Sequence, residues 1–162
     1  MSELTHIDEK GRVRMVDVTQ KNPTRRTAVA QAMVHMSAAA FQRIAEGTVS
    51  KGNVLETARI AGVMGAKKTA ELIPMCHSLN LTHVQVDFFP DAAGHAIRIE
   101  GTAKISDQTG VEMEALTAVS VAALTLYDMC KAIDKAMVIS DVCLLKKTGG
   151  KSGTFVRENT IP

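Results

Sequence analysis

Aromatic residues are scarce in this chain of 162 residues, which has no tryptophan, one tyrosine and four phenylalanines. Proteins that bind single-stranded nucleic acid stack bases on aromatic side chains, so this scarcity argues against that function. An excess of one charge is lacking as well, because 19 basic and 17 acidic side chains leave a formal net charge of +2. Such a surface has no general attraction to nucleic acid. We therefore expect no nucleic-acid partner.

Cysteine is sparse too. Cys76, Cys130 and Cys143 form no C-x-x-C pair and no even set, which favours a reduced, cytoplasmic protein over a disulfide scaffold. The amino terminus has no apolar signal core. The longest uncharged stretch of a predicted helix, Ala115 to Tyr127, is shorter than the roughly 20 residues that span a bilayer. We expect a cytoplasmic location and no membrane partner.

What the chain does have is the composition of a globular protein, with 46% hydrophobic and 22% charged residues. Periodicity predicts strands at 24–36, 81–89, 96–105 and 137–145, and helices at 38–45, 54–72 and 112–135. The order β-α-α-β-β-α-β predicts an α+β, ferredoxin-like fold, an antiparallel sheet with helices on one face. Residues 24–148 form the single domain, between a mobile arm (1–23) and a flexible basic tail (149–162).

Two features of this pattern concern packing. The middle of the second helix, Ile60 to Ala66, is apolar all round, which predicts a buried helix that a neighbour approaches closely at Gly62 and Gly65. The first and last strands carry apolar residues on both faces. A sheet with helices on one side would leave one such face wet, so we expect another subunit to cover it.

The tail contains Gly149, Gly150, Lys151 and Ser152, which suggests a phosphate-binding P-loop. That motif needs a glycine where this chain has Leu145, and a long helix after it, so the P-loop interpretation fails. A basic tail remains, either a solvated carboxyl terminus or a clamp that closes over phosphate.

Ionisable residues stand at both ends of the last helix. Asp128 and Lys131 lie three apart near its carboxyl end, where they form either an ordinary surface pair or a general acid–base pair with coupled pKa values. Glu112 and Glu114 stand at its amino end, where negative charge is favoured by the helix dipole. Lys51 precedes another helix amino terminus, and a cation there calls for an anionic partner such as a ligand phosphate.

Met75-Cys76-His77 follows Pro74 in a loop that leads into a strand. The Cys-His pair has no zinc-ligand spacing with any other histidine, so no metal site is expected. His77 is equally compatible with a half-buried loop histidine and with a catalytic one.

Taken together, several segments resemble the cyclic pyranopterin monophosphate synthase family, from about Met15 to Gly153. The most specific are the runs VEMEALTA (111–118) and YDMCKA (127–132). The others are Lys51–Val54, Thr57–Gly62, Ile73–His77 and Gly149–Gly153. Two departures are mild and flank the ionisable residues: Asn53 stands where the family usually has Asp, and Ser78 where proline usually follows the Cys-His pair.

The resemblance implies a lyase of molybdenum cofactor biosynthesis. Its substrate would be a cyclised dihydro guanosine triphosphate made by a partner radical-SAM enzyme, and its products cyclic pyranopterin monophosphate and pyrophosphate. The family also implies a ferredoxin-like homohexamer, a trimer of dimers, with its pocket at a subunit interface. No cofactor is required, although magnesium can travel with the triphosphate. The alternative is a non-catalytic oligomeric sensor of the same fold that binds a nucleotide.

The resemblance also assigns roles to residues of this chain. Asp128, Lys131 and Lys51 match the catalytic positions. The positions that line the substrate pocket or bind the triphosphate are Met75, Cys76, His77, Glu112, Met113, Glu114, Arg26, Lys147 and Lys151. Such groups suit the chemistry, because ring opening and ring closure need proton transfers near neutral pH and pyrophosphate loss needs cations at the leaving oxygens.

Overall fold

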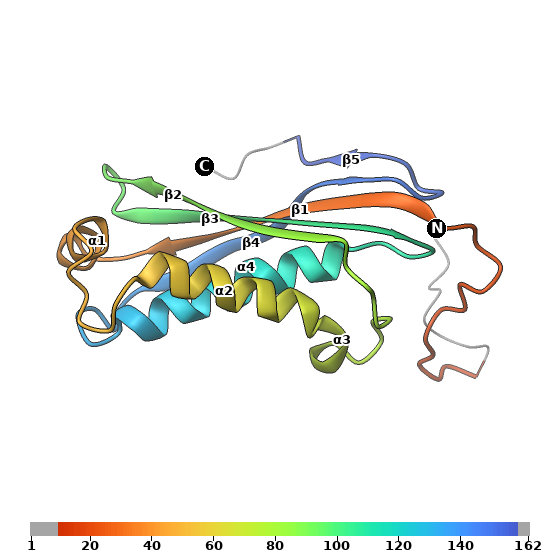
Figure 1. The fold of residues 1–162 in the computed structure, drawn as a ribbon, viewed down its shortest axis with the longest axis horizontal. Helices are drawn as coiled ribbons and strands as arrows, with labels where there is room; N and C mark the ends of the chain where they lie inside the picture. The colour runs from red at the N-terminus through yellow and green to blue at the C-terminus, as the bar shows by residue number, and fades with distance from the viewer. Residues whose placement is uncertain (1–9, 159–162) are drawn as a thin grey trace.

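A computed structural model describes residues 10–158 of the chain. The first nine residues of the predicted arm and residues 159–162 of the predicted tail lie outside these described residues. Five antiparallel strands form one sheet in the order β2-β3-β1-β4-β5. They are β1 (Thr24–His35), β2 (His83–Asp91), β3 (Ala96–Asp107), β4 (Val138–Thr148) and β5 (Phe155–Val156). The helices lie on one face of this sheet (Figure 1), so the predicted α+β class is confirmed.

The helices are α1 (Ala38–Ala45), α2 (Val54–Lys67), α3 (Thr69–Leu72) and α4 (Glu112–Cys130). The helix predicted at 54–72 is broken at Lys68, and the short α3 follows it. The predicted extension of the last helix to residue 135 is wrong. The reason is Asp134, whose carboxylate accepts hydrogen bonds from the backbone N–H groups of Ser37 and Ala136 and holds the chain in a turn. Strand β5, which pairs with the end of β4, was not predicted from the sequence.

The core lies between the sheet and α4. Alternate residues of β1 face the helix and are fully buried, namely Ala28, Ala30, Ala32 and Val34. Their small size lets α4 lie close to the sheet. At the centre, a Cβ atom added to Gly101 of β3 would lie 2.8 Å from Val119 of α4.

Helix α2 packs beside α4, and the predicted close approach at two glycines is confirmed. A Cβ atom at Gly62 would lie 2.9 Å from the carbonyl oxygen of Ala118, and one at Gly65 would lie 2.8 Å from Val121. The prediction that α2 is buried all round is wrong, because Ile60 is 61% exposed and Met64 is 54% exposed. The helices form a single layer, so each has a face that no element of the described chain covers.

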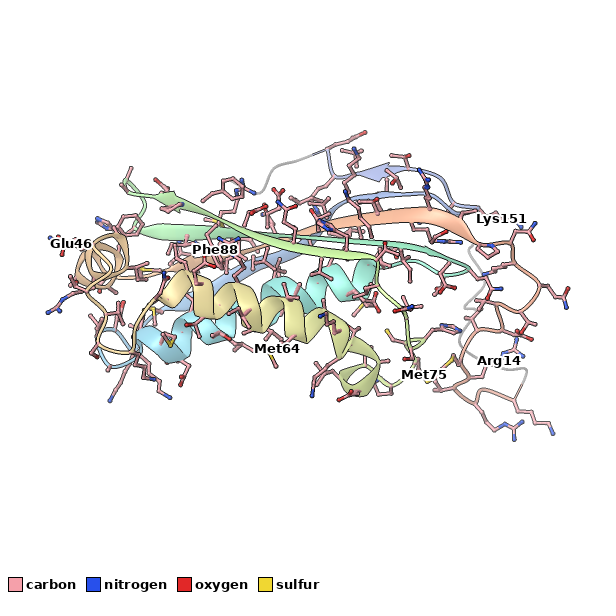
Figure 2. The ribbon with its side chains drawn as sticks, in the orientation of Figure 1. Arg14, Glu46, Met64, Met75, Phe88 and Lys151 are labelled. Carbon is pink, nitrogen blue, oxygen red and sulfur yellow. The ribbon has the colours of Figure 1, made fainter. Side chains whose placement is uncertain are left out.

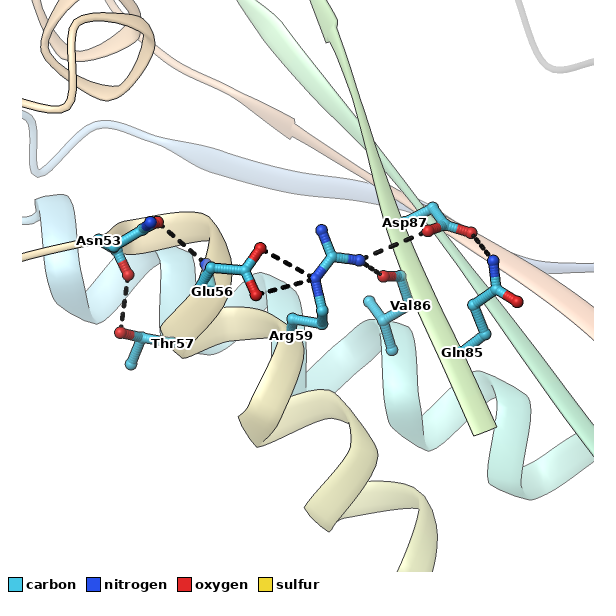
Figure 3. A network of polar contacts seen from close by, with 7 residues as sticks. All are labelled: Asn53, Glu56, Thr57, Arg59, Gln85, Val86 and Asp87. Carbon is cyan, nitrogen blue, oxygen red and sulfur yellow. Dashed lines mark hydrogen bonds and ion pairs between the residues drawn. The ribbon is translucent and has the colours of Figure 1, made fainter. Parts of the chain in front are cut away.

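A polar network ties α2 to β2 (Figure 3). The Arg59 side chain donates hydrogen bonds to Glu56 in its own helix and to the Val86 carbonyl of β2, and it lies 3.4 Å from Asp87. Its guanidinium also lies 5.2 Å from the centre of the Phe88 ring. Asn53 caps α2, since its side-chain oxygen accepts the Glu56 N–H at 3.1 Å. Asparagine therefore serves as the N-cap at this position and fixes where α2 begins.

Within the described residues, α4 is the one helix long and apolar enough to cross a membrane by length and composition. We expected no membrane-spanning helix because the uncharged stretch Ala115 to Tyr127 is too short. Helix α4 has 19 residues and is longer than this stretch, so its length does not exclude a membrane span. Of its most apolar window, 56% is buried inside the protein. Because α4 packs against β1 and β3, it has the composition and the position of a core helix.

Candidate active site

At the carboxyl end of α4, the structure brings together the three residues predicted to be catalytic. The Lys131 ammonium lies 2.6 Å from Oδ1 of Asp128, and the Lys51 ammonium lies 3.2 Å from Oδ2. Lys51 also donates a hydrogen bond of 2.8 Å to the Asp128 carbonyl oxygen. We expected an anionic partner for Lys51, and in the structure this partner is the carboxylate of Asp128. We call these three residues the lysine–aspartate cluster.

The two lysines determine the charge of this cluster. Hydrogen bonds from Lys131, and then from Lys51, lower the pKa of Asp128 below its usual range. The same contact with Asp128 raises the pKa of Lys131. The helix dipole alone would disfavour an ionised carboxylate here, but direct contact with two cations outweighs it. At neutral pH the cluster is therefore a carboxylate between two ammonium groups.

A second group of predicted site residues surrounds the amino end of α4. The Lys147 ammonium lies 3.6 Å from Oε1 of Glu112. Arg26 donates hydrogen bonds to the carbonyl oxygens of Asp107 and Gln108, at 3.0 and 2.9 Å. Arg26, Glu112 and Lys147 line a small hollow. Two cations and an acid thus share one end of the sheet.

The environment of Glu114 raises the pKa of its carboxyl group, whereas the pKa of Asp128 is lowered. Glu114 is only 3% exposed, and burial with the added charge of Glu112 raises its pKa to about 7. Sequence reasoning treated it as compensation of the helix dipole and missed its burial. The sequence did indicate this burial, because the apolar residues Ala118 and Ala122 follow Glu114 at intervals of four and lie on the same buried face of α4.

The loop with Met75, Cys76 and His77 lies at this same end. Burial, and then the charge of Glu114, raises the pKa of the Cys76 thiol, which places the thiol near that carboxyl. The His77 ring nitrogen Nε2 lies 2.9 Å from the carbonyl oxygen of Val16. Residues before β1 therefore lie against the loop, and Figure 2 shows Arg14 and Met75 at the same end of the molecule.

The first part of the predicted tail turns back beside the end of β4 and lies against Arg25 and Arg26 of β1. Residues 149–153 form a turn closed by a hydrogen bond from the Gly153 N–H to the Gly150 carbonyl oxygen, and β5 follows. Lys147 donates a hydrogen bond to the Ser152 hydroxyl. Gly149 and Gly150 have φ angles of 91° and 74°, a backbone that favours glycine. Lys151, at the tip of this turn, is exposed, while Met113 at the start of α4 is half-buried.

The two groups of residues are far apart within one chain. Glu112 and Asp128 are 16 residues apart on one helix, which corresponds to ~24 Å at 1.5 Å per residue. Figure 1 shows α4 lying lengthwise along the sheet between these two ends. The predicted site residues therefore form two half-sites: the lysine–aspartate cluster, and a carboxylate half-site that comprises Glu112, Glu114, Lys147, Arg26 and residues 75–77.

Neither half-site resembles a metal centre. In residues 10–158, the structure contains no group of three or more His, Cys, Asp and Glu side chains placed to hold a metal ion. The groups that are gathered are ammonium, guanidinium, thiol and carboxyl groups. The pKa of Glu114, raised to about 7, suits proton transfer near neutral pH, and the cations suit an anionic substrate.

The fold and the geometry define an α+β protein that has a cluster of ionisable side chains at each end of its core helix. The chain belongs to the MoaC family, whose model matches residues 15–150. It is similar to proteins named cyclic pyranopterin monophosphate synthase. That of Desulforapulum autotrophicum is 63% identical over 98% of this chain and 97% of the relative. Those of Desulfatibacillum aliphaticivorans and Heliobacterium modesticaldum are 61% and 57% identical, each over 98% of this chain and 99% of the relative.

Proposed function

We propose that this protein is a cyclic pyranopterin monophosphate synthase, a lyase of molybdenum cofactor biosynthesis. It rearranges the cyclised dihydro guanosine triphosphate supplied by a radical-SAM enzyme to cyclic pyranopterin monophosphate, and it releases pyrophosphate. Similarity to synthases along nearly the whole chain supports this proposal. The structural observation that carries it is the lysine–aspartate cluster, in which Asp128 contacts both Lys51 and Lys131.

The charge state of the cluster assigns roles to its members. Asp128, ionised between two cations, accepts a proton or stabilises positive charge that develops on the substrate rings. Lys51 and Lys131, as ammonium groups, donate protons to nitrogen or oxygen atoms as ring bonds break. Asp128 also holds the Lys131 side chain in place through their 2.6 Å contact. A substrate that displaces this contact leaves Lys131 free to transfer its proton.

The carboxylate half-site suits the other needs of the reaction. Arg26, Lys147 and Lys151 bind the triphosphate and neutralise charge on the leaving pyrophosphate oxygens. Magnesium that arrives with the triphosphate would add to these cations. Glu114, whose pKa is about 7, holds or releases a proton near neutral pH. Met75, Cys76, His77 and Met113 line the pocket around the ring system.

We infer that the two half-sites meet across a subunit interface, because one reacting centre cannot contact residues ~24 Å apart on the same rigid helix. A homohexamer built as a trimer of dimers, with ferredoxin-like subunits, fits this inference. The adjacent strands β2-β3-β1-β4, with helices on one face, support the ferredoxin-like arrangement. The cytoplasmic location expected from the sequence stays a prediction.

The experiment that tests the proposed function is turnover of the cyclised intermediate by purified protein, with the pterin product and pyrophosphate quantified. Replacing Asp128 with alanine removes the carboxylate from the cluster, so we expect a loss of about 10²-fold or more in kcat. Asp91→Asn, a change at the exposed end of β2, is the matched control and should leave turnover unchanged. Tight binding of the intermediate by the wild type without product would instead identify a nucleotide-binding sensor.

A further inference from the structure

The guanidinium of Arg26 is held by the backbone of a distant segment. Its Nε and Nη2 atoms donate hydrogen bonds of 3.0 and 2.9 Å to the carbonyl oxygens of Asp107 and Gln108, at the end of β3. Both acceptors are uncharged, so they orient the guanidinium without neutralising it. Nη1 takes part in neither bond. Arg26 therefore keeps its positive charge and the two Nη1 donors for an anionic ligand.

The turn of residues 149–153, which we call the tail turn, packs against this guanidinium through Gly150. A Cβ atom added to Gly150 would collide with Arg26 Nη1 and would lie 2.9 Å from Cζ. Cβ atoms in proteins essentially never approach another heavy atom within 3.0 Å. A side chain at position 150 is thus incompatible with the observed place of the guanidinium. Glycine, which has no Cβ atom, permits the contact.

Three glycines of the tail turn differ in what an added Cβ atom would meet. At Gly149 it would collide with the Arg25 carbonyl oxygen, a backbone atom. At Gly150 it would collide with the end of a flexible side chain, which can move aside. At Gly153 nothing lies within 4 Å, although its φ of 67° is as left-handed as the 74° of Gly150. Alanine at Gly150 therefore displaces the Arg26 guanidinium, whereas alanine at Gly153 brings backbone strain alone.

We infer that Gly150 is a positioning residue, whose contact with the Arg26 guanidinium keeps that group on its two carbonyl acceptors and oriented to bind phosphate oxygens. The tail turn also contacts the second cation of the hollow, because Lys147 donates a hydrogen bond to the Ser152 hydroxyl. The inference rests on the proposed function, since it takes Arg26 as a group that binds the triphosphate. It adds that the tail turn determines where this group lies.

The competing explanation is that Gly150 is present only for its backbone conformation. A φ of 74° favours glycine in any turn, whatever lies beside it. On that explanation, alanine at Gly150 and at Gly153 would have the same effect, because both positions have a positive φ. The close approach to Cζ of Arg26 distinguishes Gly150, and it predicts an effect on anion binding that Gly153 does not share. The two glycines are therefore a matched pair.

The test measures the binding of pyrophosphate, the proposed leaving group, to the purified full chain by titration calorimetry. Arg26→Ala removes the guanidinium and Gly150→Ala displaces it, so each should weaken binding about tenfold, the loss of one charge-assisted contact. Gly153→Ala should bind like the wild type. In the double variant no guanidinium remains to be displaced, so Gly150→Ala should add little to the effect of Arg26→Ala.

Several results would overturn the inference. Additive losses in the double variant would show that Gly150 acts independently of Arg26. Equal weakening by Gly150→Ala and Gly153→Ala would favour backbone strain, and a wild type that does not bind pyrophosphate would remove the anion site. Loss of the folded circular dichroism spectrum in Gly150→Ala would also contradict it, because moving a flexible side chain does not unfold a protein. These measurements use no cyclised intermediate, so turnover by the wild type tests the proposed function separately.

Discussion

Asp128 and Glu114 are carboxylic acids on the same helix, and their surroundings move their pKa values in opposite directions. Asp128 is exposed, and the hydrogen bonds from Lys131 and Lys51 lower its pKa. Glu114 is buried, and the loss of solvent raises its pKa to about 7. Exposure and nearby charge, rather than position along the helix, decide the protonation of each group. One helix thus holds an ionised carboxylate and a carboxyl that titrates near neutral pH.

Glu114 makes the stability of the protein depend on pH. Its pKa rises from 4.5 to about 7 on folding, so the folded state binds more protons than the unfolded state between these values. The free energy of unfolding therefore falls as the pH rises through this window, by on the order of 3 kcal/mol. We expect Glu114→Gln to lose this slope and to be more stable than the wild type at pH 8.

Urea denaturation at fixed protein concentration, from pH 4.5 to 8, measures this effect. Glu71→Gln is the control, because the Glu71 side chain is 71% exposed and lies on another helix, α3. Parallel stability curves for the wild type and Glu114→Gln would show that Glu114 does not titrate in this range.

At the scale of the elements, the position of α2 depends on two glycines. Gly62 and Gly65 let α2 lie against the backbone and side chains of α4, while Arg59 ties the same helix to β2. Because α2 follows directly after the loop that carries Lys51, its position helps to decide whether Lys51 reaches Asp128. The packing of two helices thus contributes to the geometry of the lysine–aspartate cluster.

Gly65→Ala should destabilise the protein, although alanine favours a helix by about 1 kcal/mol over glycine. The new Cβ would lie 2.8 Å from Val121 Cγ2, and overpacking of this kind costs typically 1–3 kcal/mol. We expect a net loss of about 1 kcal/mol in the free energy of unfolding, measured by urea denaturation. Adding Val121→Ala removes the colliding atoms and should restore much of this loss. A stabilised Gly65→Ala variant would show that the two helices separate at little cost.

At the scale of the whole molecule, the proposed function requires two copies of the chain, because the half-sites are separated within one copy. Arg26 and Lys147 lie at one end of the chain, and Asp128 lies at the other. If the half-sites meet across a two-fold interface, as proposed, each pair of copies has two equivalent sites, each built from two copies of the same sequence. Variants with changes in different half-sites should therefore complement each other.

Mixed assemblies of Asp128→Ala and Lys147→Ala subunits test this directly. Half of the randomly formed dimers are mixed, and each mixed dimer has one unaltered site, so about a quarter of the wild-type activity should return. The readout is turnover by co-expressed, differently tagged subunits. Asp128→Ala mixed with Lys131→Ala is the matched control, because both changes fall in the same half-site and every site stays defective. Equal activity in the two mixtures would contradict a shared site.

Local sequence patterns determined much of this protein. Alternation in β1 and β3, the cap at Asn53 and the glycines of α2 act through neighbouring residues, so the elements and the α+β class were predictable from them. The spacing of Asp128 and Lys131 likewise predicted a contact that the structure shows at 2.6 Å. Such features depend on helix and strand periodicity alone.

Other features were decided only by the tertiary structure, because they depend on residues distant in the chain. Asp134 ends α4 by binding the backbone N–H of Ser37, and β5 exists because the chain returns to pair with β4. The exposure of Ile60 follows from a helical layer one helix deep. The raised pKa of Glu114 comes from its burial in the folded protein, and the separation of the half-sites comes from the length of α4 between them.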